Sequence, residues 1–250
     1  TAQAYGDAEQ TLGKILIDSD HFKVITKIKV PVNAKNQGLH AHLETVFEAS
    51  LKKLKTRSIE ALMLHSSDVL QGDKASIIID WLDSLIARKA ISRYGVSIYD
   101  SSELSYIPLD KFKLFQIPLS IFDQRFLCDG TINLLQDAGV SIHARSIFMQ
   151  GVVLAKSNDL PDFFTEEFCG HHQELQKYLA LTNQSALDIS LHFIKSINSI
   201  EAALIDIDSL PQLKQICRSW ATPKPPLVVS DFSRFAWNVS SDLDPRQWNP

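Results

Sequence analysis

The sequence predicts an α/β protein in which helices join the strands of one parallel sheet. Short apolar runs alternate with longer segments whose apolar residues recur at helical spacing, which is the pattern of repeated βα units. Some runs, such as residues 61–64, are apolar without alternation, as expected for parallel strands that are covered on both faces. The runs therefore fit the strands of a barrel or of a doubly wound sheet.

The apolar pattern places six strands. They are expected at residues 23–28, 59–65, 91–98, 113–119, 140–147 and 201–207. Amphipathic helices are predicted around residues 78–86 and 186–194, where apolar side chains repeat every three or four positions. Ser209 is the expected N-cap of a further helix. The tail beyond Trp220, with Pro223, Pro225 and Pro226 near its start, is predicted to be extended.

Size and composition favour one barrel domain. The chain has 250 residues, of which 45% are hydrophobic and 22% charged, enough for a substantial core. We expect residues 1–250 to form a single domain, in which residues from about 221 to 250 are a tail over the barrel. A monomer or a weak oligomer is expected.

Charge and cysteine content argue against several classes of partner. The net charge of -4 gives no global attraction to nucleic acid or to anionic lipid, so neither is expected as a partner. The three cysteines are widely spaced and suggest neither a disulfide framework nor a zinc ribbon, which fits a reducing cytoplasm. The sequence contains no apolar run of the roughly 20 residues that a membrane span needs.

Four polar residues are candidates for chemistry. Tyr5 stands before Gly6, and Lys27, His65 and Ser97 each close an apolar run. In a parallel barrel the carboxyl ends of the strands carry the functional loops. Each residue taken alone has an ordinary interpretation as a turn or as a solvated strand end, so the candidate site depends on the four occurring together.

These residues lie in segments that resemble, in order, the signature segments of aldo-keto reductases. The segments are Thr1-Ala2-Gln3-Ala4-Tyr5-Gly6, Ile25-Thr26-Lys27, Leu64-His65, Gly95-Val96-Ser97, Phe115-Gln116-Ile117-Pro118, Ala144-Arg145-Ser146-Ile147-Phe148-Met149-Gln150-Gly151 and Ser209-Leu210-Pro211-Gln212-Leu213. The ending Asp244-Pro245-Arg246-Gln247-Trp248 is similar to bacterial branches found among polysaccharide-associated reductases. The resemblance implies a (β/α)8 TIM barrel and an NAD(P)H-dependent oxidoreductase that reduces a small aldehyde or ketone, with sugar-derived carbonyls among the options.

The resemblance also implies catalytic roles. A carbonyl oxygen needs a proton as hydride reaches the carbon, and a phenol supplies it more readily beside a cation. Tyr5 would be the general acid, Lys27 the cation and His65 the donor that orients the carbonyl. The aspartate that pairs with the lysine in this family would directly precede Thr1. We expect it in a longer gene product, together with two more strands and one crossover helix, because eight strands close this barrel.

Cofactor residues follow from the same resemblance. Ser97 and Gln116 match positions that hold the nicotinamide carboxamide, whereas Ile98 replaces an asparagine that many members have. Arg145 replaces an aromatic residue that stacks on the nicotinamide, and a guanidinium can also lie flat on a π system. The remaining cofactor-binding positions implied are Ser146, Gly151, Ser209 and Gln212.

The choice between NADP(H) and NAD(H) stays open. Asp206 and Asp208 stand where many members place a basic cluster for the 2′-phosphate of NADPH, and two carboxylates would repel that phosphate. Lys214 and Arg218 could compensate from the following helix, whose N-terminus could also bind an anion.

Two histidine-containing segments outside this pattern have ordinary interpretations. The segment Cys169-Gly170-His171-His172 lacks further ligands at metal spacing, so no metal is expected and a helix start is favoured. His143 is expected to be a core or rim histidine.

Two alternative functions remain: a non-catalytic relative that binds nucleotide or regulates a partner, and an unrelated barrel enzyme that uses Lys27 as a Schiff base or His65 as a proton shuttle.

Overall fold

A computed structural model describes residues 1–16, 21–31, 35–222 and 229–248 of the chain. Its strands form a six-stranded sheet in sequence order, and the pairs β1–β2, β2–β3, β3–β4 and β5–β6 are parallel. The strands are β1 (Ile25–Ile28), β2 (Ile59–Leu64), β3 (Ile91–Ser97), β4 (Leu114–Pro118), β5 (Ser141–Arg145) and β6 (Ile200–Ala203). The predicted parallel α/β fold and all six predicted strands are confirmed.

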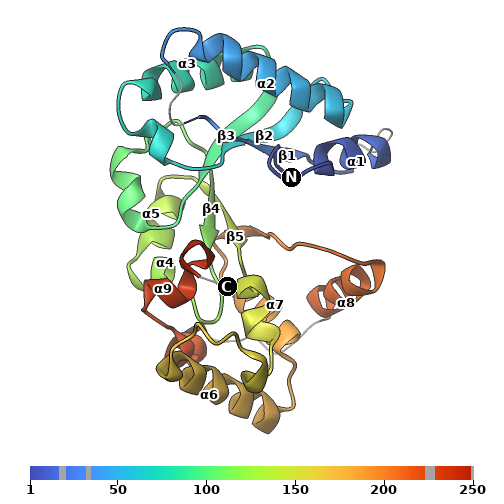
Figure 1. Cartoon of the computed structure of the whole chain (residues 1–250), viewed down its shortest axis with the longest axis vertical. Helices are drawn as coiled ribbons and strands as arrows, with labels where there is room; N and C mark the ends of the chain where they lie inside the picture. Colours follow the sequence, from blue (N-terminus) through green and yellow to red (C-terminus); the bar gives the residue numbers. More distant parts are fainter. Residues whose placement is uncertain (17–20, 32–34, 223–228, 249–250) are drawn as a thin grey trace. The chain divides into compact units, whose positions relative to one another are not determined.

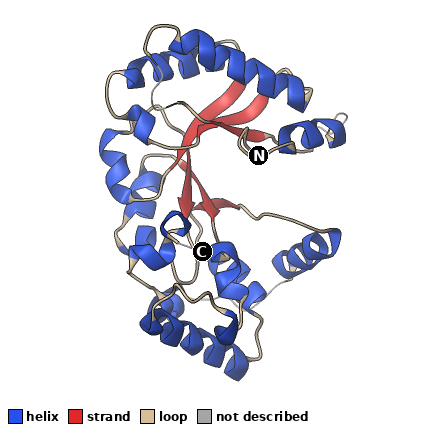
Figure 2. Cartoon of the chain, in the orientation of Figure 1, coloured by secondary structure: helices blue, strands red, loops and turns tan. Residues whose placement is uncertain are grey.

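Helices join the strands and follow the last of them (Figure 2). The α-helices are α1 (Ala8–Ile15), α2 (Leu39–Leu54), α3 (Lys74–Ala87), α4 (Arg125–Cys128), α5 (Thr131–Asp137), α6 (Glu166–Thr182), α7 (Ala186–Ser196), α8 (Leu210–Ala221) and α9 (Ser240–Leu243). The 3-10 helices are η1 (Asp68–Leu70), η2 (Ser101–Tyr106), η3 (Met149–Leu154), η4 (Ser157–Asp159), η5 (Val229–Phe235) and η6 (Pro245–Gln247). No helix in the described ranges is long and apolar enough to cross a bilayer.

The chain divides into two compact units. The first unit comprises Thr1–Gln116 and Asp137–Val140, and the second comprises Ile117–Gln136 and Ser141–Pro250. In the first unit, α2 and α3 lie on the same side of strands β1 to β3 (Figure 1). Phe47 of α2 and Trp81 of α3, both fully buried, meet edge to face with 6.2 Å between ring centroids. This apolar layer holds the strands that carry Lys27, His65 and Ser97.

The second unit is built around buried aromatic side chains. Phe122, Phe168, Phe193 and Phe232 are all fully buried, and α7 packs against η3, η5 and α8. The His171 ring, on α6, bonds the carbonyl oxygen of Phe235 at 2.8 Å. The His171–Phe235 hydrogen bond therefore holds the carboxyl-terminal tail against α6.

The prediction of an extended tail is wrong for the described residues 229–248, which contain η5, α9 and η6. Buried aspartates explain the difference. Asp242 accepts a hydrogen bond from the Trp237 indole at 2.8 Å, and Asp244 caps η6 by accepting the Arg246 amide at 3.0 Å. Burial alone would raise the pKa of Asp244, but hydrogen bonds from Arg246 and Gln247 outweigh it and lower that pKa. The three prolines that suggested extended structure lie outside the described residues.

The last strand is shorter than predicted. β6 ends at Ala203, whereas the apolar pattern suggested continuation to residue 207. The Leu204 amide still donates to the Ala144 carbonyl at 2.7 Å. Beyond it, Asp206, Ile207 and Asp208 are exposed, so the chain leaves the sheet where its carboxylates reach solvent.

Gly95 should be essential for the pairing of β3 with β4. A Cβ atom there would lie 2.1 Å from the Leu114 carbonyl oxygen. We therefore expect Gly95→Ala to lower the free energy of unfolding by about 1–3 kcal/mol or more. Gly170→Ala is the matched control, because the new Cβ meets nothing within 4 Å in α6 and should stabilise the helix by roughly 0.5–1 kcal/mol. Urea unfolding followed by circular dichroism measures both changes, and equal stabilities for the two variants would contradict the proposed steric role.

Candidate active site

The structure brings Tyr5, Lys27 and His65 together in the first unit. Tyr5 lies in the turn before α1, Lys27 in β1, and His65 directly after β2. The Lys27 ammonium donates a hydrogen bond to the Tyr5 hydroxyl at 3.3 Å. The Tyr5 and His65 rings meet edge to face with 6.2 Å between centroids. Three groups that are distant in sequence thus form one polar cluster.

Burial differs across this cluster. Lys27 is only 9% exposed, His65 is half-buried and Tyr5 is 48% exposed. The His65 amide donates to the Ile28 carbonyl at 3.0 Å, which ties the end of β2 to β1. The cation is therefore shielded from solvent, while the phenol remains accessible to a small molecule.

Helix α1 fixes the turn that carries Tyr5. Glu9 in α1 is 1% exposed and accepts a hydrogen bond from the Thr26 hydroxyl at 2.6 Å. The second Glu9 oxygen lies 3.9 Å from the Lys53 ammonium at the end of α2. Gly13 allows the close approach, since a Cβ there would be 2.1 Å from the Lys53 carbonyl oxygen. Thr26 and Lys27 face opposite sides of β1, so one strand holds both α1 and the cation beside Tyr5.

Ser97 and Gln116 form a second pair in the first unit. They are register partners on β3 and β4 and are 3% and 1% exposed. The Gln116 side-chain oxygen is buried and has no hydrogen-bond partner within the described part of the chain. Its neighbour Ile98 is fully buried and cannot supply the amide that asparagine would. The Gln116 oxygen therefore offers an acceptor that an external carboxamide could satisfy, and Ser97 is its register neighbour on β3.

A loop with unusual backbone geometry follows β5 in the second unit. Arg145 ends the strand and donates to the Ser146 hydroxyl at 3.3 Å. Ser146, Met149 and Gln150 have positive φ angles of 58°, 47° and 54°, and Gly151 has a φ of 94°. Left-handed non-glycine residues are strained and often occur at functional sites. This loop keeps three of the predicted cofactor positions together.

The predicted positions Ser209 and Gln212 cap the N-terminus of α8. The Ser209 hydroxyl accepts the Gln212 amide at 3.3 Å, which confirms Ser209 as the N-cap. In return, the Gln212 side-chain oxygen accepts the Asp208 amide at 2.7 Å. Asp206 and Asp208 are exposed beside this helix start, so negative charge surrounds it.

Sequence reasoning missed three polar residues that support these loops. Glu9 and Thr26 join α1 to β1, and Glu103 joins the segments after β2 and β3. Only Glu103 had a recognisable signal, because Asp100-Ser-Ser-Glu103 has the spacing of a capping box.

The histidines interpreted as ordinary have structural contacts. His143 lies in β5, 3.8 Å from Glu201. Buried His172 bonds Ser157 and the Val152 carbonyl, both at 3.0 Å, and burial lowers its pKa. The segment of residues 169–172 lies inside α6, which begins at Glu166 after the N-cap Thr165, so the helix starts earlier than predicted. No group of three or more potential metal ligands occurs among the residues with described positions.

Comparison with known proteins identifies the family. The profile of the aldo/keto reductase family matches residues 1–235, so the chain belongs to this family. The Uncharacterized oxidoreductase YcsN of Bacillus subtilis (strain 168) is 24% identical over an alignment of 153 residues that covers 56% of this chain and 50% of that protein. The chain thus matches about half the length of this curated relative.

Solved structures support the same fold. The holo form of aldo-keto reductase AKR11C1 from Bacillus halodurans superimposes with a TM-score of 0.72 at 20% identity, over 91% of this chain and 75% of that chain. The thermostable aldo-keto reductase Tm1743, in complex with the inhibitor epalrestat, gives a TM-score of 0.69 at 16% identity, over 94% and 80% of the two chains. The fold is that of the TIM barrel, and the interpretation as an unrelated barrel enzyme is excluded by the family assignment.

The Glu9 contact should be important for stability. We expect Thr26→Val to lower the free energy of unfolding by about 1–3 kcal/mol, because it leaves the buried Glu9 carboxylate without its 2.6 Å hydrogen bond. Thr45→Val is the control, since the exposed Thr45 hydroxyl bonds only its own helix, at Ala41, and should change stability by no more than about 0.5 kcal/mol. Denaturant titration compares the variants, and similar small losses would show that the Glu9 contact contributes little.

Proposed function

We propose that the chain is an NAD(P)H-dependent reductase of a small aldehyde or ketone. The contact between the Lys27 ammonium and the Tyr5 hydroxyl, with the His65 ring beside it, is the observation that supports this function most directly. Family membership supplies the reaction class, oxidoreductase chemistry. The geometry supplies an accessible acid and a shielded cation.

Each member of the cluster has a task in the proposed reaction. As hydride adds to the carbonyl carbon, the π electrons move to the oxygen, which takes the proton of the Tyr5 hydroxyl. The Lys27 ammonium stabilises the phenolate that remains. His65 donates a hydrogen bond to the same carbonyl oxygen and orients it. In the oxidative direction the phenolate would accept the alcohol proton.

The residues present fit a nicotinamide cofactor. The buried Gln116 oxygen would accept a hydrogen bond from the carboxamide NH2, and Ser97 would hold its other side. In the second unit, the family resemblance assigns Arg145, Ser146, Gly151, Ser209 and Gln212 to cofactor binding. The reduced nicotinamide supplies the hydride when it is bound.

A non-catalytic nucleotide-binding role is the second candidate. The substitution of Ile98 for asparagine and of Arg145 for an aromatic residue favours it, because both changes fall in the cofactor positions. Such a protein would bind NADPH or NADH without consuming either. Titration with both cofactors, followed by a panel of aldehydes and ketones monitored by loss of reduced cofactor, separates the two functions.

Tyr5→Phe should abolish carbonyl reduction and leave cofactor affinity nearly unchanged, because it removes the acid alone. Lys27→Met should also cripple catalysis, since the phenol loses its neighbouring cation. The loss is expected to be roughly 100-fold or more, the usual size of an acid–base contribution. Tyr178→Phe is the matched control, because Tyr178 lies in α6 against Phe235. Steady-state rates and cofactor titration by fluorescence measure both properties. Wild-type turnover by Tyr5→Phe would refute the mechanism.

Discrimination between NADPH and NADH should be weak. Asp206 and Asp208 are exposed at the start of α8 and would repel a 2′-phosphate. We expect Asp206→Asn and Asp208→Asn each to raise the ratio of NADPH affinity to NADH affinity by up to about five-fold, the range of exposed ion-pair effects. Asp159→Asn, a charge change in η4, should alter neither affinity. A strong wild-type preference for NADPH would show that another basic residue binds the phosphate.

A further inference from the structure

We propose that Glu103 is a positioning residue that couples the loop carrying His65 to the loop carrying Ser97. The inference rests on the proposed function, in which His65 orients the carbonyl and Ser97 holds the nicotinamide. Glu103 lies in η2, which follows β3, and is itself outside the reacting cluster.

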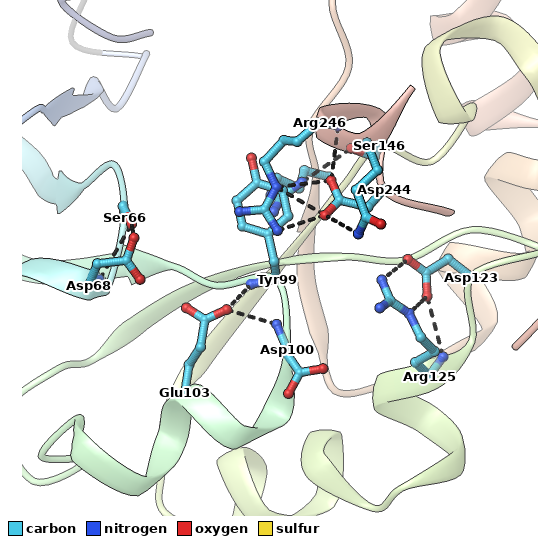
Figure 3. A network of polar contacts seen from close by, with 12 residues as sticks. Ser66, Asp68, Tyr99, Asp100, Glu103, Asp123, Arg125, Ser146, Asp244 and Arg246 are labelled. Carbon is cyan, nitrogen blue, oxygen red and sulfur yellow. Dashed lines mark hydrogen bonds and ion pairs between the residues drawn. The ribbon is translucent and has the colours of Figure 1, made fainter. Parts of the chain in front are cut away.

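One carboxylate oxygen of Glu103 holds the chain that follows Ser97. It accepts the amides of Tyr99 at 2.7 Å and of Asp100 at 2.8 Å (Figure 3). Asp100 in turn accepts the Ser102 amide at 2.9 Å, which completes a capping box. This oxygen therefore fixes the path of the backbone immediately after β3.

The other carboxylate oxygen holds the chain that follows His65. It accepts a hydrogen bond from the hydroxyl of Ser67, which is fully buried and stands two residues after His65. The Ser67 hydroxyl also lies 2.8 Å from the Tyr106 hydroxyl at the end of η2. The Ser67 bond thus joins residues 36 positions apart in sequence.

Capping alone does not explain the second bond. Asp100 and the first Glu103 oxygen already satisfy the amides at the start of η2. Capping of η2 therefore does not require the hydrogen bond from Ser67. The added bond makes the two loops move as one body. Hydride transfer depends on the distance between the carbonyl carbon and the nicotinamide, and a displacement of about 1 Å can cost roughly 100-fold in rate.

Three variants separate positioning from capping. Glu103→Ala removes both links, Ser67→Ala removes only the link to the His65 loop, and Glu103→Gln keeps an oxygen for the amides and an NH2 for Ser67. At saturating NADPH, with 4-nitrobenzaldehyde as the carbonyl probe, we expect kcat to fall roughly 10- to 100-fold in the two alanine variants. Glu103→Gln should remain within about three-fold of wild type. The double variant Ser67→Ala/Glu103→Ala should be no slower than Glu103→Ala alone, because both substitutions break the same Ser67–Glu103 bond.

Asp83→Ala is the matched control. The half-buried Asp83 carboxylate also accepts two side-chain bonds in the first unit, from Tyr94 at 2.7 Å and Lys111 at 2.8 Å. Burial tends to raise its pKa, but these bonds outweigh that effect and lower the pKa. Asp83→Ala should therefore lower the melting temperature without changing kcat or KM.

Amide hydrogen exchange gives a readout that does not require activity. Residues 66–70 should exchange faster in Glu103→Ala and Ser67→Ala than in wild type or Asp83→Ala. Unchanged exchange there, or alanine variants whose kcat and KM equal those of the control, would overturn the positioning role. A wild-type chain that neither binds nor consumes NADPH would refute the proposed function instead, and the exchange measurement would still decide the coupling.

Discussion

The position of the Lys27 ammonium beside the Tyr5 hydroxyl governs the candidate site. It depends on the pleat of β1, which turns neighbouring side chains to opposite faces. Thr26 bonds the buried carboxylate of Glu9, and Lys27 reaches Tyr5 on the other side. A shift of β1 by one residue would exchange these faces and place the cation among the helices. The apolar layer of α2 and α3 therefore supports the chemistry by fixing this strand.

Much of the fold could be predicted because its causes are local. Short apolar runs marked the six strands, and some of them, such as residues 61–64, lack alternation because parallel strands are buried on both faces. Ser209 was recognisable as an N-cap from its place before Leu210 and Pro211, and it caps α8 as predicted. The proximity of Lys27 and His65 also followed from sequence, because the carboxyl ends of parallel strands meet at one edge of the sheet, whereas the place of Tyr5 followed from the family resemblance.

Features that depend on distant contacts could not be predicted. A glutamate at position 9 would ordinarily be expected to face solvent near a helix start, yet Glu9 is buried because Thr26 supplies a partner. The bond between Ser67 and Glu103 joins two loops that sequence spacing does not relate. The tail was predicted as extended from its prolines, whereas Asp242 and its neighbours fold it into short helices through side-chain bonds.

Under the proposed function, the differences from the family pattern fall on the predicted cofactor positions, while Tyr5, Lys27 and His65 are all present in the candidate cluster. Ile98 is completely buried, so it fills its position with apolar volume and leaves Gln116 with fewer polar neighbours. Under the same proposal, Asp206 and Asp208 place negative charge near the expected position of the 2′-phosphate. Lys27 and His65 each contact Tyr5, and the altered positions are other residues, so a substitution at those positions can change cofactor affinity without removing the acid or its cation.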